Sequence, residues 1–312
     1  MVALLSHLIQ SFRWVVSTFA PNYPLFAGLS ANHSTVVHHL NIPLPPVLHK
    51  RLDNEFIDGF DEVIVIGDIH GCYDELIQLL DQIKDNILDS NQNNDSNNNT
   101  NRILKLFVGD LVNKGPKSKE VIQLMIDNKD SCLSVRGNHD EVVIKQYLQY
   151  ESEGETGLLE KNKWMTQLTR KQIEYLISMP YTISIPSLNA LVVHAGILPN
   201  VDLNQQNIKD MIEMRNLVIE DEFTGKMRAV SSHKTGEPWV NHWSGPQHIY
   251  FGHDAKRKLQ TPPFCTGLDT GLVYGNDLTA VFIHGPRNGS YVSVKANAVH
   301  SQPKIVNNSV EN

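Results

Sequence analysis

The amino-acid sequence predicts an α/β fold in which two packed β-sheets carry helices on their outer faces, a four-layer αββα sandwich. Two observations favour this class. Between residues 62 and 135, apolar runs of strand length alternate with segments of helical periodicity. Between residues 181 and 295, further strand-length runs recur. A strand–helix–strand order needs crossover connections and is typical of a parallel sheet, and with the strand-rich second half the order fits two sheets packed together with helices outside.

The first half of the fold is predicted from five consecutive elements. The apolar run at residues 62–66 predicts a strand, and residues 73–88 carry leucine and isoleucine at helical spacing. Residues 103–108 and 132–135 predict two more strands, with a helix over residues 119–128 between them. These strands are therefore expected to lie parallel in one sheet.

The second half begins with a helical region that is predicted from residue 141 to about residue 178. Strands dominate the rest of the chain, where short apolar runs are separated by turn residues. The strand candidates are residues 181–185, 190–193, 248–251, 279–283 and 291–295.

The chain is predicted to consist of a domain at residues 58–300 with two flanking segments. Residues 1–57 are expected to form an N-terminal helix and an extended arm, because apolar residues recur at helical spacing over residues 5–16. This helix would either dock on the domain or associate with a membrane. An Asn-rich insertion at residues 89–101 has too few apolar residues to bury, and residues 301–312 form a polar tail.

Composition and charge exclude several classes of protein. The net charge of −7 argues against a protein dedicated to nucleic acid. No stretch reaches the roughly 20 apolar residues of an integral membrane span. The three cysteines, Cys72, Cys132 and Cys265, are an odd number without paired spacing, which argues against a disulfide framework. Cys72 directly follows a polar block and is interpreted as a small residue packed behind the site.

Five glycine-containing polar blocks lie at the ends of predicted strands, where open α/β sheets generally build their sites. They are Gly67–Gly71, Gly109–Gly115, Arg136–Asp140, Val193–Gly196 and Phe251–Asp254. The metal ligands predicted in them are Asp68, His70, Asp110, Asn138, His194 and His253. Mixed Asp, Asn and His ligation suits zinc, manganese or iron better than calcium or magnesium. Two such ions side by side would bind phosphoryl oxygens and generate a hydroxide nucleophile, so the blocks predict a phosphoesterase.

One histidine in these blocks is interpreted as a catalytic group and not as a ligand. His139 lies beside the ligand Asn138 and would act as the general acid that protonates the leaving oxygen. Asp140 is expected to orient its ring.

Cationic side chains are expected to hold the phosphate groups of the substrate. The candidates are Lys114, Arg136 and Arg215. A basic run at residues 256–258 follows the last block and is either a solvated surface or a surface that holds a polyanion.

These blocks resemble the calcineurin-like metallophosphoesterases, in the branch with serine/threonine protein phosphatases and bacterial symmetrical diadenosine tetraphosphatases. The resemblance covers about residues 60–285 and implies the calcineurin-like phosphoesterase fold with a dinuclear metal site at the strand ends. It also implies His139 as the catalytic histidine, preceded by Arg136. The implied ligands are Asp68, His70 and Asp110 for one metal, and Asp110, Asn138, His194 and His253 for the other.

The chain departs from the protein phosphatases at one pair of residues. Asn113 and Lys114 stand where those enzymes carry Asp–Arg, so Asn113 lacks the charge that orients the catalytic histidine, and Lys is a poorer bidentate phosphate ligand than Arg. Other segments look like the tetraphosphatase branch and together resemble the fungal zinc-dependent endopolyphosphatase group, which makes Arg215 the phosphate-binding arginine. These segments are residues 194–196, 214–216, 238–243 and 267–275.

The sequence therefore predicts a hydrolase that uses two divalent cations, Zn, Mn or Fe. Its expected partner is a phosphate-containing small molecule or polymer. The predicted reaction is cleavage of phosphoanhydride bonds in inorganic polyphosphate or dinucleoside polyphosphates. A serine/threonine protein phosphatase and an inactive, metal-stabilised binding module are the alternatives. Localisation is open between the cytoplasm and, by the fungal resemblance, the vacuole.

Overall fold

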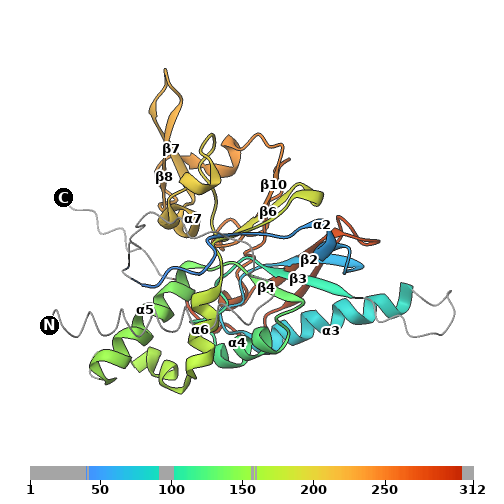
Figure 1. Ribbon diagram of the computed structural model, residues 1–312, viewed down its shortest axis with the longest axis vertical. Helices are drawn as coiled ribbons and strands as arrows, with labels where there is room; N and C mark the ends of the chain where they lie inside the picture. The colour runs from blue at the N-terminus through green and yellow to red at the C-terminus, as the bar shows by residue number, and fades with distance from the viewer. Residues whose placement is uncertain (1–39, 41, 91–101, 156–157, 159, 304–312) are drawn as a thin grey trace. The chain divides into compact units, whose positions relative to one another are not determined.

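The structure is a computed structural model that describes residues 40, 42–90, 102–155, 158 and 160–303 (Figure 1). The predicted N-terminal helix, the Asn-rich tract at 91–101 and the tail from residue 304 lie outside these residues. Among the described residues, none of the helices combines the length and the apolar character that a membrane crossing requires.

The first sheet contains the three predicted parallel strands of the first half, and two strands from the second half of the chain join it. Its strand order is β13–β12–β2–β3–β4. The strands β2, β3 and β4 are parallel, and β12 lies antiparallel to both β2 and β13. The strands are β2 (Glu62–Ile66), β3 (Ile103–Phe107), β4 (Cys132–Ser134), β12 (Asp277–His284) and β13 (Tyr291–Lys295).

The second sheet has the order β1–β5–β6–β10–β11. It comprises β1 (His49–Arg51), β5 (Thr182–Ile185), β6 (Ala190–Val193), β10 (His248–Phe251) and β11 (Cys265–Gly267). Its first strand differs from the prediction, because β1 pairs in parallel with β5 although it lies in the segment predicted to be an arm. Its three residues are all basic and show no apolar alternation, so the sequence carries no strand signal there.

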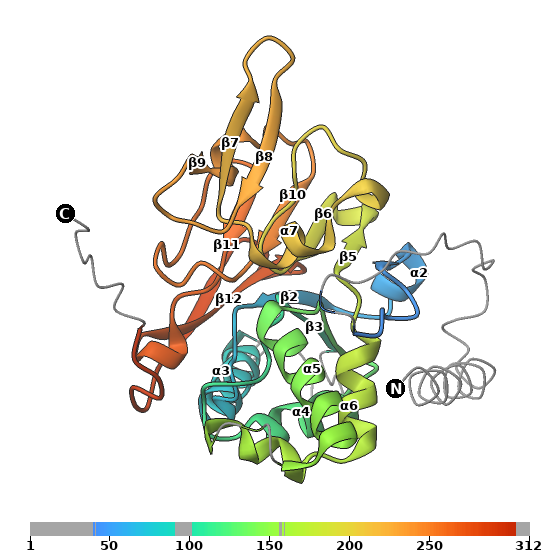
Figure 2. The ribbon, with the colours of Figure 1, turned by 90° about the vertical axis from the view of Figure 1, so that its left-hand side faces the viewer.

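The two sheets pack face to face and bury one apolar cluster between them (Figure 2). The first sheet contributes Val63, Val65 and Leu106, and the second contributes Ile183 and Val192, each buried. The predicted sandwich of two sheets is therefore confirmed. Because the polar blocks follow strands of both sheets, this packing brings them toward the same end of the sandwich.

Helices cover the outer face of the first sheet (Figure 2). They are α3 (Tyr73–Ser90), α4 (Ser118–Asp127), α5 (Asn138–Glu153) and α6 (Arg170–Ser178). The helical region predicted from residue 141 to 178 is divided, with a 3₁₀ segment η4 (Glu160–Gln167) between α5 and α6. Thr169 and Gln172 form a capping box that starts α6, which explains the break.

The outer face of the second sheet carries mainly strands. A second apolar cluster there packs Trp239, Met211 and Leu217 against Val193 and Phe251 of the sheet. The elements on this face are α7 (Ile208–Glu213), β7 (Asn216–Asp221), β8 (Lys226–Val230) and β9 (Glu237–Pro238), the three strands forming a small antiparallel sheet. The β7–β8 hairpin projects away from the sandwich (Figure 2).

The remaining described elements are short. They are α2 (Asn54–Ile57) and the 3₁₀ turns η5 (Pro186–Leu188), η6 (Leu203–Gln205), η7 (Trp239–His242) and η8 (Leu272–Tyr274).

Candidate metal centre

The six predicted ligands converge from both sheets. Asp68 and His70 follow β2, Asp110 follows β3, His194 follows β6 and His253 follows β10, while Asn138 opens α5. Ligand atoms of Asp68, His70 and Asp110 lie within 4.8 Å of one another, and so do those of Asp110, His194 and His253. Asp110 belongs to both groups, so the two groups are adjacent.

The two carboxylate oxygens of Asp110 face opposite sides. Oδ2 lies 3.5 Å from Nε2 of His70, and Oδ1 lies 3.4 Å from Nε2 of His194. Oδ1 of Asn138 lies 3.1 Å from Nε2 of His194 and 3.0 Å from Nδ1 of His253. This is the geometry expected when one carboxylate serves two cations and an amide oxygen completes one of the two ligand groups.

Backbone carbonyls orient all three imidazoles. The ring nitrogen that points away from the centre donates to Val112 O in His70 (3.3 Å), to Val108 O in His194 (2.8 Å) and to Glu213 O in His253 (3.1 Å). The other nitrogen of each ring therefore presents a lone pair to the centre, as a metal ligand must.

Strained backbone holds the ligands in place. His70, Asp110 and His253 all have φ in the left-handed region, at 50°, 50° and 68°. Few non-glycine residues adopt this conformation, and it concentrates at functional sites. Glycine is required beside them, because a Cβ on Gly252 would lie 1.9 Å from Oδ1 of Asp68 and one on Gly137 would lie 2.2 Å from Oδ1 of Asp110.

Charges at the centre favour bound cations. Burial, together with the nearby Lys114 ammonium, holds the pKa of His70 well below its usual value. Burial and the Arg215 guanidinium do the same for the pKa of His253. The imidazoles are therefore neutral and ready to ligate. Burial and the charges of Asp269 and Asp110 raise the pKa of Asp68 well above its usual value, and a bound cation would relieve this.

His139 lies beside this centre. Its ring meets the His70 ring edge to face, with 4.9 Å between the ring centres. Its backbone N–H donates to Oδ1 of Asp110. Nδ2 of Asn113 lies 3.2 Å from Nδ1 of His139, so the amide at this position contacts the predicted acid.

Asp140 has a different role from the predicted one. Its carboxylate accepts hydrogen bonds from the backbone N–H groups of Gly137, Asp110 and Leu111, at 2.8–3.0 Å. It is fully buried at the start of α5 and fixes the turns that carry the ligands. The Asn113 amide contacts the His139 ring.

Two of the three predicted phosphate-binding cations lie at the centre. Nζ of Lys114 lies 3.0 Å from Nε2 of His70 and 5.2 Å from the centre of the Tyr274 ring. Arg215 donates to the carbonyl oxygens of His253 and Ser231. Nε of Arg215 is buried and has no hydrogen-bond partner among the described residues.

Arg136 is not placed as predicted. Its side chain is fully buried and donates to Tyr181 Oη and to the carbonyl oxygens of Pro43 and Ile177. Nη1 lies 4.0 Å from Oε1 of Glu141, which accepts a hydrogen bond from Tyr181. This guanidinium has no exposed surface to offer a phosphate, and it stabilises the interior behind the centre.

Two further acidic side chains were not selected from the sequence. Asp269 is 6% exposed, and burial raises its pKa to about 6, with the nearby Asp110 carboxylate adding to the rise. Asp254 accepts from Nε2 of His233 at 2.7 Å and from Arg257 at 2.5 Å. Asp269 follows β11 and lies between Gly267 and Gly271, a pattern that could have indicated it from the sequence. His233 lies in no such pattern.

The family assignment follows from comparison with known proteins. The family model described as calcineurin-like phosphoesterase matches residues 62–275, which span all five polar blocks. The chain belongs to this family. It is an enzyme family that uses divalent metals, and the predicted phosphoesterase fold is confirmed.

Several relatives carry more specific names. The chain is 28% identical over 235 residues to the asymmetrical bis(5'-nucleosyl)-tetraphosphatase PrpE of Oceanobacillus iheyensis, covering 70% of this chain and 87% of the relative. It is 23% identical over 288 residues to the zinc-dependent endopolyphosphatase of Saccharomyces cerevisiae, covering 80% and 84%. The crystal structure of a candidate diadenosine tetraphosphatase matches with a TM-score of 0.64 and 30% identity, covering 80% of this chain and 98% of that one.

Proposed function

We propose that this metallophosphoesterase hydrolyses phosphoanhydride bonds of inorganic polyphosphate or dinucleoside polyphosphates. The observation that carries the proposal is the position of Asp110, whose two oxygens face His70 and His194 in two adjacent ligand groups. A carboxylate shared in this way is what two neighbouring cations require.

The ligand roles follow from the two groups. Asp68, His70 and Asp110 would hold one cation. Asp110, Asn138, His194 and His253 would hold the other. Imidazole, amide and carboxylate ligands together suit zinc, manganese or iron. Two such cations, when bound, supply the positive charge that activates water and neutralises phosphoryl oxygens.

Protonation of the leaving oxygen is assigned to His139. Its ring lies against His70, where it could donate to an oxygen leaving the centre. The facing group is the amide nitrogen of Asn113, since Oδ1 of that amide accepts the backbone N–H of Lys114 at 2.9 Å. An NH₂ group can only donate, so this contact gives Nδ1 of His139 no negatively charged partner.

A phosphoanhydride and a phosphoserine ester differ in how much protonation their leaving groups need. A phosphoanhydride releases a phosphate anion that is stable near neutral pH, because the second ionisation of a phosphate group lies near about pH 6. A phosphoserine ester instead releases an alkoxide, which needs a strong acid at that moment. The Asn113 contact therefore supports anhydride cleavage over protein dephosphorylation.

Two cationic side chains are assigned to the phosphate chain of the substrate. Lys114 would contact it on the His70 side of the centre, and Arg215 on the His253 side. A substrate with several phosphates can use both side chains at once, which fits the tetraphosphatase and endopolyphosphatase names of the relatives.

A parallel assay tests the proposal. The protein is loaded with Zn, Mn or Co and supplied with long-chain polyphosphate, diadenosine tetraphosphate and a phosphoserine peptide. Hydrolysis of polyphosphate or of the dinucleotide in preference to the peptide is the expected result, and the preferred one of the two identifies the substrate. Faster turnover of the peptide would contradict the proposal and favour a protein phosphatase. If the metal-loaded protein hydrolysed none of the three substrates, a binding module would be favoured.

A further inference from the structure

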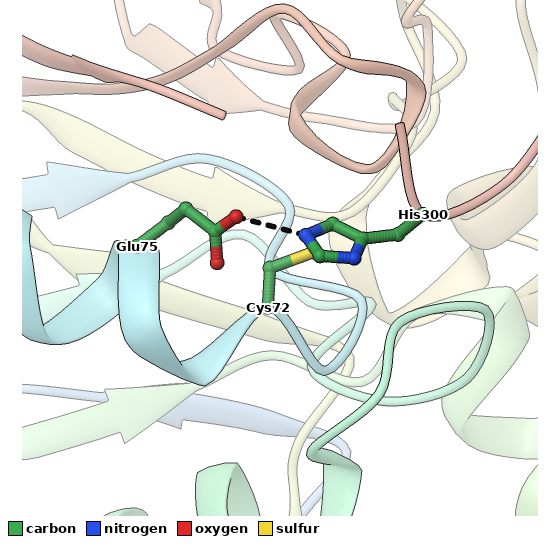
Figure 3. A group of neighbouring side chains, drawn as sticks. All are labelled: Cys72, Glu75 and His300. Atoms are coloured by element: carbon green, nitrogen blue, oxygen red, sulfur yellow. Dashed lines mark hydrogen bonds and ion pairs between the residues drawn. The ribbon is translucent and has the colours of Figure 1, made fainter. Parts of the chain in front are cut away.

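A second group of metal-ligand side chains lies outside the predicted centre. Cys72, Glu75 and His300 each present one ligand atom, and these atoms lie within 4.8 Å of one another. None of the three belongs to the centre described above. Figure 3 shows the thiol of Cys72 and the carboxylate of Glu75 gathered around the His300 ring.

Local structure explains how two of the three side chains meet. Cys72 immediately precedes α3, and Glu75 lies in its first turn. A spacing of three residues puts both side chains on the same side of the helix start. Their exposed fractions are 0% and 1%, so both face the interior.

The third side chain comes from the far end of the chain. The segment after β13 returns to the start of α3, where the backbone N–H of Asn297 donates to Oε1 of Glu75 at 3.0 Å. The N–H groups of His300 and Ser301 both donate to Val273 O, which fixes the segment on η8. Nε2 of His300 then lies 2.8 Å from Oε1 of Glu75.

The composition of the group indicates which ion would fit. Zinc takes thiolate at about 2.3 Å and imidazole or carboxylate at about 2.0–2.2 Å, and three protein ligands plus a water is one of its regular coordinations. A thiolate selects zinc over magnesium or calcium. The His300 side chain is 17% exposed, so solvent can reach the fourth position.

The side chains of the group supply the charge that a divalent cation needs. The Glu75 carboxylate belongs to the group, and a coordinated zinc ion deprotonates its thiol ligand, so Cys72 would add a thiolate to that carboxylate.

We propose that Cys72, Glu75 and His300 bind a zinc ion separate from the phosphoesterase centre. This ion would fasten the segment 296–301 to the start of α3, directly behind the turn that carries His70. Its role is to stabilise that turn, and it does not depend on which phosphate substrate the enzyme uses.

Cobalt spectroscopy tests this site without reference to turnover. The phosphoesterase ligands are nitrogen and oxygen atoms, so only a cysteine-bound Co²⁺ ion gives a thiolate-to-metal charge-transfer band in the near ultraviolet. The full-length wild-type protein loaded with Co²⁺ should show the band, and Cys72→Ser should lose it. Cys265→Ser is the matched control, because that cysteine is also buried and belongs to none of the metal-ligand groups found among the described residues.

Metal counting supplies the second readout. His300→Gln can still donate to Glu75 but is a poor zinc ligand, and it should bind one zinc fewer per chain than the wild type. Asp110→Asn should keep the charge-transfer band, since that ligand belongs to the other centre. Absence of the band from the wild type, or its survival in Cys72→Ser, would overturn the proposal and leave an ion pair between Glu75 and His300.

Discussion

Nδ2 of Asn113 lies 3.2 Å from Nδ1 of His139, and the amide faces the ring with its donor. Replacing this amide by a carboxylate would reverse the contact, because an oxygen accepts from Nδ1–H and stabilises the imidazolium. Asn113→Asp should therefore place a charged partner beside His139, as in the protein phosphatases.

The measurable consequence concerns the substrate class. In Asn113→Asp, turnover of a phosphoserine peptide should rise relative to the wild type. Polyphosphate turnover should change less, because its leaving group needs less protonation. The control is Asn288→Asp, which adds the same charge at an exposed turn. Equal turnover of the peptide by Asn113→Asp and Asn288→Asp would mean that Asn113 does not affect proton donation by His139.

Removal of the acid should slow hydrolysis without removing metal. His139→Asn is expected to reduce kcat by roughly 10²–10⁴-fold, the usual contribution of a general acid. The reduction should be smaller for polyphosphate than for the peptide. Elemental analysis should find the same metal content as in the wild type. Loss of metal instead would show that His139 is a ligand.

Arg136 should affect stability and not substrate binding. Arg136→Met removes the buried guanidinium whose Nη1 lies 4.0 Å from Oε1 of Glu141, and breaking such a buried pair costs about 3–5 kcal/mol of unfolding free energy. Chemical denaturation should show that loss, while KM stays near the wild-type value. Arg215→Lys provides the comparison and should raise KM with little change in stability. If Arg136→Met kept the wild-type denaturation midpoint and raised KM, the predicted phosphate-binding role of Arg136 would be supported.

Metal binding should release a proton from the Asp68 carboxyl group. Burial and the charges of Asp269 and Asp110 raise its pKa, whereas the pKa values of His70, His194 and His253 are lowered below 6.5. The acid therefore holds a proton that a cation must displace, and metal affinity should increase as pH rises toward the pKa of metal-free Asp68.

Titration calorimetry in two buffers of different ionisation enthalpy measures that proton. The apparent enthalpies of metal binding should differ between the buffers in mildly acidic solution. Asp269→Asn removes the charge that contributes most to the shift after burial, so it should reduce the difference. Identical enthalpies in both buffers for the wild type would show that Asp68 is already ionised.

The ligand set was accessible from sequence because each ligand sits in a local pattern. A carboxylate, imidazole or amide beside glycine after an apolar run marks a turn at the end of a strand, and the structure shows why glycine is needed at 137 and 252. The same reasoning failed for neighbours of the ligands. Arg136 and Asp140 lie within two residues of Asn138, yet their side chains point into the interior, and sequence adjacency does not encode that direction.

Other features had no sequence signal because they depend on distant contacts. The strand β7 is exposed from Ile219 to its end at Asp221, so the β7–β8 hairpin has no sustained apolar alternation. The approach of His300 to Cys72 and Glu75 joins residues more than two hundred positions apart. Only the fold creates these contacts.

The central claim is that Asp110 is shared by two cations that perform the hydrolysis. The most direct measurement compares Asp110→Asn with Asp127→Asn, a change at the end of α4 on an exposed side chain, for zinc content and polyphosphate turnover. Asp110→Asn should fold, bind less zinc and lose at least about 100-fold in turnover, whereas Asp127→Asn should match the wild type. Full turnover by Asp110→Asn would contradict the account.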